Sequence, residues 1–298
     1  MKAGPPSWRL EWVVSCVVFV VWYAVGILLL ATDWLPEDFG EMSKVWGDMV
    51  FLSLAAVVTL FFSARMCGIG PALRISAVIL GVSAGAEMLG ATTGFPFGAY
   101  QYTENLGPRL FGVMPMIIPL CWLTIVLNSF WIAVFLFQKH AAGNPTAKFL
   151  MIISAAFLSV LTDLNLEPVA SSVKLYWIWF EPGVHYYGVP GFNFFGWMMI
   201  SLVTMGIFID FLPQNFRLPA IPWTSYALLA SINLLFALIN FRAGFHVPVF
   251  VALNTFGVLG IFLAIKETRI ADSKAAISGQ PSAAGQQQIE AGSKKQEA

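Results

Sequence analysis

Three acidic residues stand in or beside stretches that are otherwise apolar enough to lie in a lipid bilayer. Glu87 falls within the apolar run 72–93, Asp163 within the run 148–166, and Glu167 directly after it. An ionisable side chain at the centre of a membrane helix costs roughly 2.5 to 3.5 kcal/mol on insertion scales, so each such residue is a candidate for function. The chemistry they offer is proton transfer in a water-poor pocket.

Asp163 and Glu167 are spaced i, i+4, which places both carboxyl groups on one face of a helix, one turn apart. Two carboxyl groups this close hinder each other's ionisation, so we expect one to keep its proton at neutral pH. Structural alternatives stay open. Glu167 precedes Pro168 and could simply end a helix, while Glu87 and Asp163 could only cross-link helices.

The remaining charged and metal-binding residue types carry weaker signals. Asp48 follows Gly47 near a helix start, where a carboxylate either caps free amide groups or takes part in function, and Asp210 fits an interfacial position. The three histidines, His140, His185 and His246, have no metal-ligand spacing. We therefore expect no metal site.

The composition indicates that the solvent of this chain is a membrane. Of 298 residues, 58% are hydrophobic and 11% charged, with Lys and Arg balanced by Asp and Glu. No basic run or P-loop is present, which excludes a nucleic-acid partner. Three isolated cysteines in apolar stretches do not form a disulfide pattern. Runs of about twenty apolar residues predict an all-α bundle of eight transmembrane helices, near 12–31, 46–64, 72–93, 116–137, 148–166, 192–212, 222–241 and 247–265.

The spans also predict domains and orientation. Residues 1–270 form the expected transmembrane catalytic domain, and the Ala, Ser, Gly, Gln and Lys composition of 271–298 predicts a disordered tail. With both termini cytoplasmic, the outer loops hold only four basic residues, Lys44, Arg109, Lys174 and Arg242. We expect a multi-pass protein of a bacterial inner or plasma membrane.

At about 1.5 Å per residue, Glu87 lies about 22 Å from Ala72, and Asp163 lies about 22 Å from Lys148. Both carboxyl groups are therefore expected at one level, in the outer third of the bilayer. The sequence from Thr92 to Trp122 follows directly and is rich in Gly, Pro and aromatic residues. Irregular backbone at membrane depth is tolerated where it lines a cavity or packs on protein, so we expect a re-entrant outer loop that covers a carboxylate-lined chamber.

Four stretches of the chain resemble a known family. They are GATTGFPFGAYQYTENLGPRLFGVMPMIIPLCW, DLNLEPVA, YWIW and YYGVPGFNFFGW, within about residues 85–200. These motifs are similar to those of the integral-membrane carotenoid biosynthesis proteins, which include carotenoid 1′,2′-hydratases. Val113, Met114 and Pro115 stand where the family pattern has Val-Pro, a one-residue variation.

The resemblance implies hydration of the terminal C1′=C2′ double bond of an acyclic carotenoid such as γ-carotene, lycopene or bisanhydrobacterioruberin, without a cofactor. Glu87, Asp163 and Glu167 would act as acid and base, in an order that the residues leave open. Aromatic faces can stabilise the cation that protonation creates. The expected substrate-binding set is Thr92, Phe95, Phe97, Tyr100, Tyr102, Asn165, Trp177, His185, Asn193 and Trp197.

Two other functions stay open at this stage. An end-group cyclase or isomerase would use the same acid but would quench the cation by losing a proton. A membrane transporter or carotenoid-binding scaffold would use the carboxylates to carry ions or to brace helices. Carotenoid, water and the lipid bilayer are the expected partners, and the oligomeric state is left open.

Overall fold

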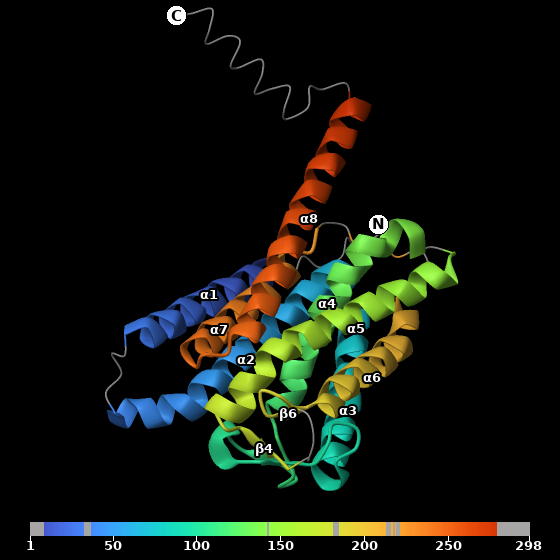
Figure 1. The fold of residues 1–298 in the computed structure, drawn as a ribbon. Coiled ribbons are helices and arrows are strands. Elements are labelled where there is room, and N and C mark those ends of the chain that lie inside the picture. Colours follow the sequence, from blue (N-terminus) through green and yellow to red (C-terminus); the bar gives the residue numbers. More distant parts are fainter. Residues whose placement is uncertain are drawn as a thin grey trace, which may run out of the picture. The chain divides into compact units, whose positions relative to one another are not determined.

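The computed structural model describes residues 9–32, 37–141, 143–180, 185–212, 216, 218 and 221–278. Met1–Leu253 forms one compact unit and Asn254–Ala298 a second. The described residues contain eight helices that are long and apolar enough to cross a membrane, so the expected all-α class and span count are confirmed (Figure 1). The helices are α1 Arg9–Thr32, α2 Glu37–Cys67, α3 Ile69–Thr93, α4 Ile118–Ala141, α5 Pro145–Pro168, α6 Gly191–Phe208, α7 Trp223–Arg242 and α8 His246–Ser278.

The ends of two helices lie well outside the expected spans. α2 begins at Glu37, where a polar stretch continues the helix beyond its apolar part. α8 runs to Ser278, so its last turns include the first residues of the expected tail, and residues 279–298 lie outside the described part of the chain. The expected break between the last two spans is confirmed. Gly244 has φ 78°, and the amide of Phe245 donates to the Asn240 carbonyl at 2.8 Å.

α4 is the central helix of the first unit. In its most apolar window 83% of the residues are buried, compared with 11% for α1, and α4 packs against α2, α3, α5 and α7. α1 instead packs against α2, where Phe19 and Phe51 stack with ring centroids 5.5 Å apart. The central helix α4 therefore sets the positions of α3 and α5, and α6 packs against these two helices (Figure 1).

Polar side chains join the helices inside this core. Asn128 of α4 donates to the Thr59 hydroxyl of α2 at 2.7 Å, and Trp131 donates to Ser63 at 2.8 Å. Such hydrogen bonds favour one packing arrangement, because an apolar surrounding offers these groups no other partner. All three cysteines are free thiols, as expected.

Short strands connect the helices at one end of the bundle (Figure 1). They form three two-stranded antiparallel ribbons, and a 3-10 turn, η1 Glu104–Leu106, lies between two of the strands. β1 Tyr100–Tyr102 pairs with β4 Trp177–Trp179, although the two strands are far apart in sequence. β2 Arg109–Leu110 pairs with β3 Met114–Pro115, and β5 His185–Tyr186 pairs with β6 Val189–Pro190.

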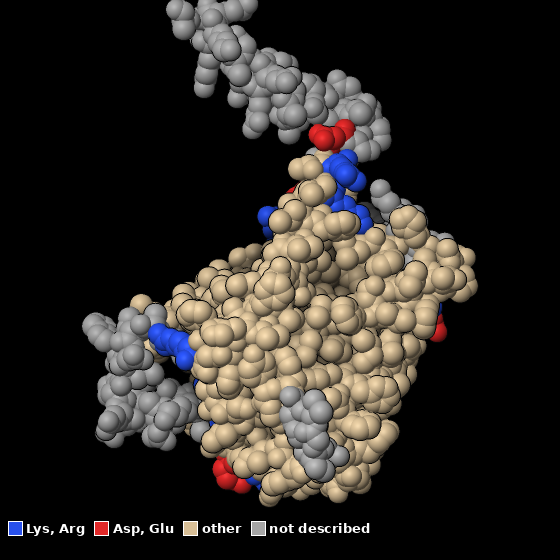
Figure 2. All heavy atoms as spheres, in the orientation of Figure 1, with Lys and Arg blue, Asp and Glu red and all other residues tan. Residues whose placement is uncertain are grey.

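Charged residues are scarce on the side of the bundle that faces the viewer in Figure 2. Those at helix ends pair with each other. Lys148, in the first turn of α5, contacts Asp210 at 2.9 Å in the 3-10 turn η3 Ile209–Phe211, and both side chains are exposed. This ion pair agrees with the interfacial position expected for Asp210.

Candidate active site

A cavity of about 30 Å³ lies where α3, α4, α5 and α6 meet the β1–β4 ribbon. Apart from its two acidic residues and Asn193, the lining consists of apolar and aromatic side chains and one thiol. The lining residues are Glu87, Phe97, Tyr100, Tyr102, Ile118, Cys121, Trp122, Leu166, Glu167, Trp177, Trp179, Asn193 and Trp197. The two halves of the chain that carry the sequence motifs therefore share one site.

Glu87 is buried on α3 and accepts three hydrogen bonds. The Tyr100 and Tyr102 hydroxyls donate to its Oε2 at 2.7 and 2.6 Å, and Trp122 Nε1 of α4 donates to its Oε1 at 2.8 Å. Burial raises the pKa of the Tyr102 phenol well above its ordinary value, and the adjacent Glu87 carboxyl raises it further. The pKa of Tyr100 is raised by the same two causes in the same order. Both phenols therefore keep their protons and remain donors.

The turn after α3 brings these tyrosines to Glu87. Gly94 ends the helix in the left-handed region, at φ 81°, and its amide donates to the Gly90 carbonyl at 2.8 Å. The Phe97 side chain then packs between two glycines, Gly90 on α3 and Gly196 on α6. A Cβ atom at either glycine would lie under 3.0 Å from the Phe97 ring, so only glycine leaves room for this ring.

Strand geometry directs alternate residues of β1 toward the cavity. Tyr100 and Tyr102 are buried and Gln101 between them is exposed. Their cross-strand partners are Trp179 and Trp177 of β4, and the Tyr100 and Trp179 ring centroids are 5.0 Å apart. The ribbon therefore places a layer of four aromatic rings over the cavity.

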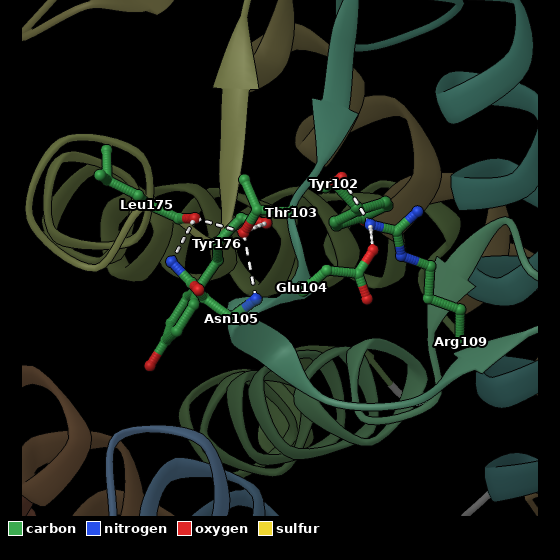
Figure 3. Close-up of polar contacts among 7 residues, drawn as sticks. All are labelled: Tyr102, Thr103, Glu104, Asn105, Arg109, Leu175 and Tyr176. Carbon is green, nitrogen blue, oxygen red and sulfur yellow. Dashed lines mark hydrogen bonds and ion pairs between the residues drawn. The ribbon is translucent and has the colours of Figure 1, made fainter. Parts of the chain in front are cut away.

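The loop after β1 is tied to the segment before β4 by polar contacts (Figure 3). Thr103 donates to the Leu175 carbonyl at 2.5 Å, and the Asn105 side chain donates to the same carbonyl at 3.2 Å. Arg109 bridges the Glu104 carboxylate and the Tyr102 carbonyl, each at 2.8 Å. These bonds fix the backbone of both aromatic strands.

Asp48 of α2 holds the second strand from the other side. Its carboxylate contacts Lys174 Nζ at 3.0 Å and accepts a hydrogen bond from the Tyr176 hydroxyl. Of the two alternatives for Asp48, this geometry supports a structural role, as the anchor of the chain between the π-helical turn η2 Val169–Val173 and β4.

The other two acidic residues of the site, Asp163 and Glu167, lie on α5. Asp163 is fully buried and its Oδ2 accepts from Asn193 Nδ2 of α6 at 2.8 Å, while its Oδ1 has no hydrogen-bond partner among the described residues. Glu167, one turn further, lines the cavity, and its Oε2 accepts from Trp177 Nε1 at 3.1 Å. Asp163 thus lies next to the cavity, where it is hydrogen-bonded to the lining residue Asn193, and Glu167 lines the cavity directly.

Most of the expected site residues line this cavity and Asp163 lies beside it through Asn193, but three described residues do not reach it. Thr92 and Phe95 are exposed, and the Thr92 hydroxyl bonds back to the Met88 carbonyl of its own helix at 2.8 Å. The Asn165 amide instead joins α5 to α7 through Asn233 and Asn240, because it points away from the Asp163 face. His185 lies in β5, and its side chain falls outside the described part of the structure.

Trp122 is the principal site residue that the sequence interpretation missed. Its indole lies against that of Trp197, with ring centroids 3.7 Å apart and an angle of 10° between the planes, while its N–H reaches Glu87. In a long apolar helix a tryptophan fits simple packing. The available signal was its need for a hydrogen-bond acceptor when buried, with Glu87 as a buried acceptor in a neighbouring span.

Metal binding receives no support from the described residues, among which no group of three or more His, Cys, Asp or Glu side chains is placed to hold an ion. The acidic residues are engaged instead with aromatic and amide donors. The arrangement can therefore move protons within a small, largely apolar hollow.

Comparison with known proteins gives two matches. The family model of carotenoid biosynthesis proteins matches residues 47–259. A bisanhydrobacterioruberin hydratase of Haloarcula japonica is 32% identical over 195 residues, which cover 64% of this chain and 62% of that protein. The match thus spans less than two thirds of the relative's length. No solved structure matches this chain.

Proposed function

Because this chain belongs to the carotenoid biosynthesis protein family, we propose that it hydrates the terminal C1′=C2′ double bond of an acyclic carotenoid. The product is a tertiary alcohol at C1′. The similarity to a bisanhydrobacterioruberin hydratase supports a hydratase-type reaction. γ-Carotene, lycopene and bisanhydrobacterioruberin all have the acyclic end that this reaction requires.

One observation carries the proposal. Glu87, Asp163 and Glu167 are all buried. Glu87 and Glu167 line one aromatic cavity from two helices, and Asp163 lies beside it through its hydrogen bond to Asn193. An isolated trisubstituted alkene is a weak base, so its protonation needs an acid that is held against it without competing water. The carboxyl groups provide acid and base in one place.

The aromatic lining suits the intermediate of this reaction. Protonation at C2′ leaves a tertiary cation at C1′, and ring faces attract a cation through their quadrupoles. The stacked Trp122 and Trp197 and the four rings of the ribbon line the cavity in which that charge would form.

The cavity is small compared with a carotenoid end. Its volume of about 30 Å³ has room for about two water molecules. A branched hydrocarbon end therefore enters only when the side chains around the cavity move. Strands β1 and β4 contribute lining side chains that lie outside the helices and cover the cavity. A polyene of forty carbons is roughly as long as the bilayer core is thick, about 30 Å, so its end reaches this level from within the membrane.

The proposal includes the orientation of the chain. The few basic residues beside the strands, among them Arg109 and Lys174, support an outward-facing cavity and cytoplasmic termini. The water would then come from the outer side, and the substrate from the lipid.

Expression in a host that accumulates lycopene or γ-carotene tests the function. We expect pigments that are heavier by one water per reacted end, formed by the purified protein without added cofactor. Pigments of unchanged mass but altered retention would indicate a cyclase or isomerase instead. Pigment that copurifies unchanged with a correctly inserted protein would indicate a binding scaffold.

A further inference from the structure

The Glu87 carboxyl group is the acceptor in each of its three side-chain hydrogen bonds. An indole N–H can only donate, so Oε1 must accept from Trp122. Oε2 faces two phenol hydroxyls whose protons are firmly held. Both oxygens are thus occupied by donors, and neither is left to present a proton to a substrate. This geometry fits a carboxylate.

The pair on α5 is arranged differently. Asp163 receives one hydrogen bond, at Oδ2, and its Oδ1 is buried without a partner. Glu167 receives an indole N–H at the longer distance of 3.1 Å. An oxygen without a donor can itself carry a proton, so among the described residues Asp163 Oδ1 gives this pair a free position that Glu87 lacks.

We infer that the carboxyl groups divide the reaction, with the Asp163–Glu167 pair as proton donor and Glu87, positioned by Trp122, as the base for the incoming water. This inference rests on the proposed hydration. Glu167 lines the cavity and delivers the proton, and Asp163 behind it belongs to the same donor pair. Glu87 lies at the same cavity on another helix, as a base acting on a separate molecule requires.

The steps balance without a further reactant. The electron pair of the double bond takes the proton from the donor pair and forms the new C–H bond at C2′, which leaves C1′ cationic. A water oxygen bonds to C1′, and its surplus proton passes to Glu87. The proton then returns from Glu87 to the donor pair across the cavity that Glu87 and Glu167 share, so the net change is one added water.

Trp122 is a positioning residue in this scheme. Its ring is fixed by Trp197, and its N–H fixes Glu87 Oε1 at 2.8 Å. Removal of the N–H should leave the carboxylate free to turn. A cation that is not captured promptly by water loses a proton and returns to the alkene, and this return is measurable.

The experiment runs the full-length protein in D2O and compares two quantities, hydrated product and deuterium in the recovered substrate. In Glu87→Gln we expect product formation to fall by at least about tenfold while exchange persists, since loss of a general base costs about 10² to 10⁴ in rate. In the double variant Asp163→Asn, Glu167→Gln we expect both to be lost. The reverse pattern, with exchange lost in Glu87→Gln and kept in the double variant, would overturn the assignment.

Trp122→Phe tests the positioning role, with Trp131→Phe as its matched control. Both residues are buried on α4, both donate an indole hydrogen bond of 2.8 Å, and Trp131 donates to Ser63 outside the cavity lining. We expect the ratio of exchange to product to rise several-fold in Trp122→Phe and to stay at the wild-type value in Trp131→Phe. An equal ratio in the two variants would contradict the role. A wild-type protein that gives neither product nor exchange would instead refute the hydration itself.

Discussion

Asp163 and Asn193 join the fifth and sixth helices through a single buried hydrogen bond of 2.8 Å. It is the only side-chain hydrogen bond of Asp163 among the described residues. Removal of a partner from a buried charged or polar group costs about 1 to 3 kcal/mol. In Asn193→Ala we therefore expect both a lower unfolding free energy and a loss of turnover, measured by thermal unfolding in detergent and by product yield.

Asn165 provides the contrasting case on the same helix. Its side chain links α5 to α7, so Asn165→Ala should also lower stability by about 1 to 3 kcal/mol. Because Asn165 does not line the cavity, turnover per folded molecule should stay near the wild-type value. If turnover fell while the unfolding free energy stayed at the wild-type value, the result would indicate that Asn165 contributes to substrate binding.

Gly196 on α6 should not tolerate a larger side chain. A Cβ atom there would lie 2.5 Å from the Phe97 ring and 3.1 Å from the Pro96 carbonyl oxygen. We expect Gly196→Ala to lower stability by about 1 to 3 kcal/mol, as overpacking does, and to reduce activity by displacing Phe97. Gly206→Ala on the same helix meets nothing within 4 Å and should stay within about 1 kcal/mol of the wild type. Partial recovery in the double variant Gly196→Ala, Phe97→Leu would identify the ring as the cause.

The anchor at Asp48 should matter more than a salt bridge at the surface. Asp48→Asn weakens the bonds to Lys174 and Tyr176, both partly or largely buried, and should cost about 1.5 to 3 kcal/mol. Glu104→Gln breaks the pair with Arg109, but Glu104 is 86% exposed, so the cost should stay below about 1 kcal/mol. Thermal unfolding of the two variants compares them directly, and equal losses would contradict an anchoring role.

The proposed orientation can be checked by labelling single cysteines with a membrane-impermeant maleimide in intact cells. Gln101→Cys, exposed on β1, should react from the outside, and Thr146→Cys, exposed at the start of α5, should react only after the cells are opened. The background should lack the natural cysteines, because Cys121 lines the cavity. The opposite labelling pattern would invert the topology.

The helices could be predicted from the sequence because the bilayer imposes a simple rule on composition. Long apolar runs predicted all eight spans found among the described residues, and the break at Gly244 separated the last two. Helix ends in polar sequence were less predictable, as α2 shows, because a helix can continue into water without an apolar signal.

The site could be predicted only where the type of a single residue is energetically unfavourable in its apolar sequence surroundings. Glu87, Asp163 and Glu167 stand out because a carboxyl group in an apolar run needs a reason. Trp122 does not stand out, since its role depends on the rotation of α4 toward α3. The exposed position of Phe95 likewise follows from the turn at Gly94, after which Phe97 is the ring that points inward. Pairing between β1 and β4 is a long-range contact that neither short strand indicates by itself.

The narrowness of the hollow between α3 and α5 has a consequence for how such a reaction ends. Where only one or two water molecules fit, water acts as a stoichiometric reactant and not as a solvent. In the proposed reaction, a carbocation formed there would not meet bulk solvent, and its fate would depend on which single molecule or side chain lies next to it. Widening this space would therefore be expected to change which product leaves the protein before it changes how fast the substrate is consumed.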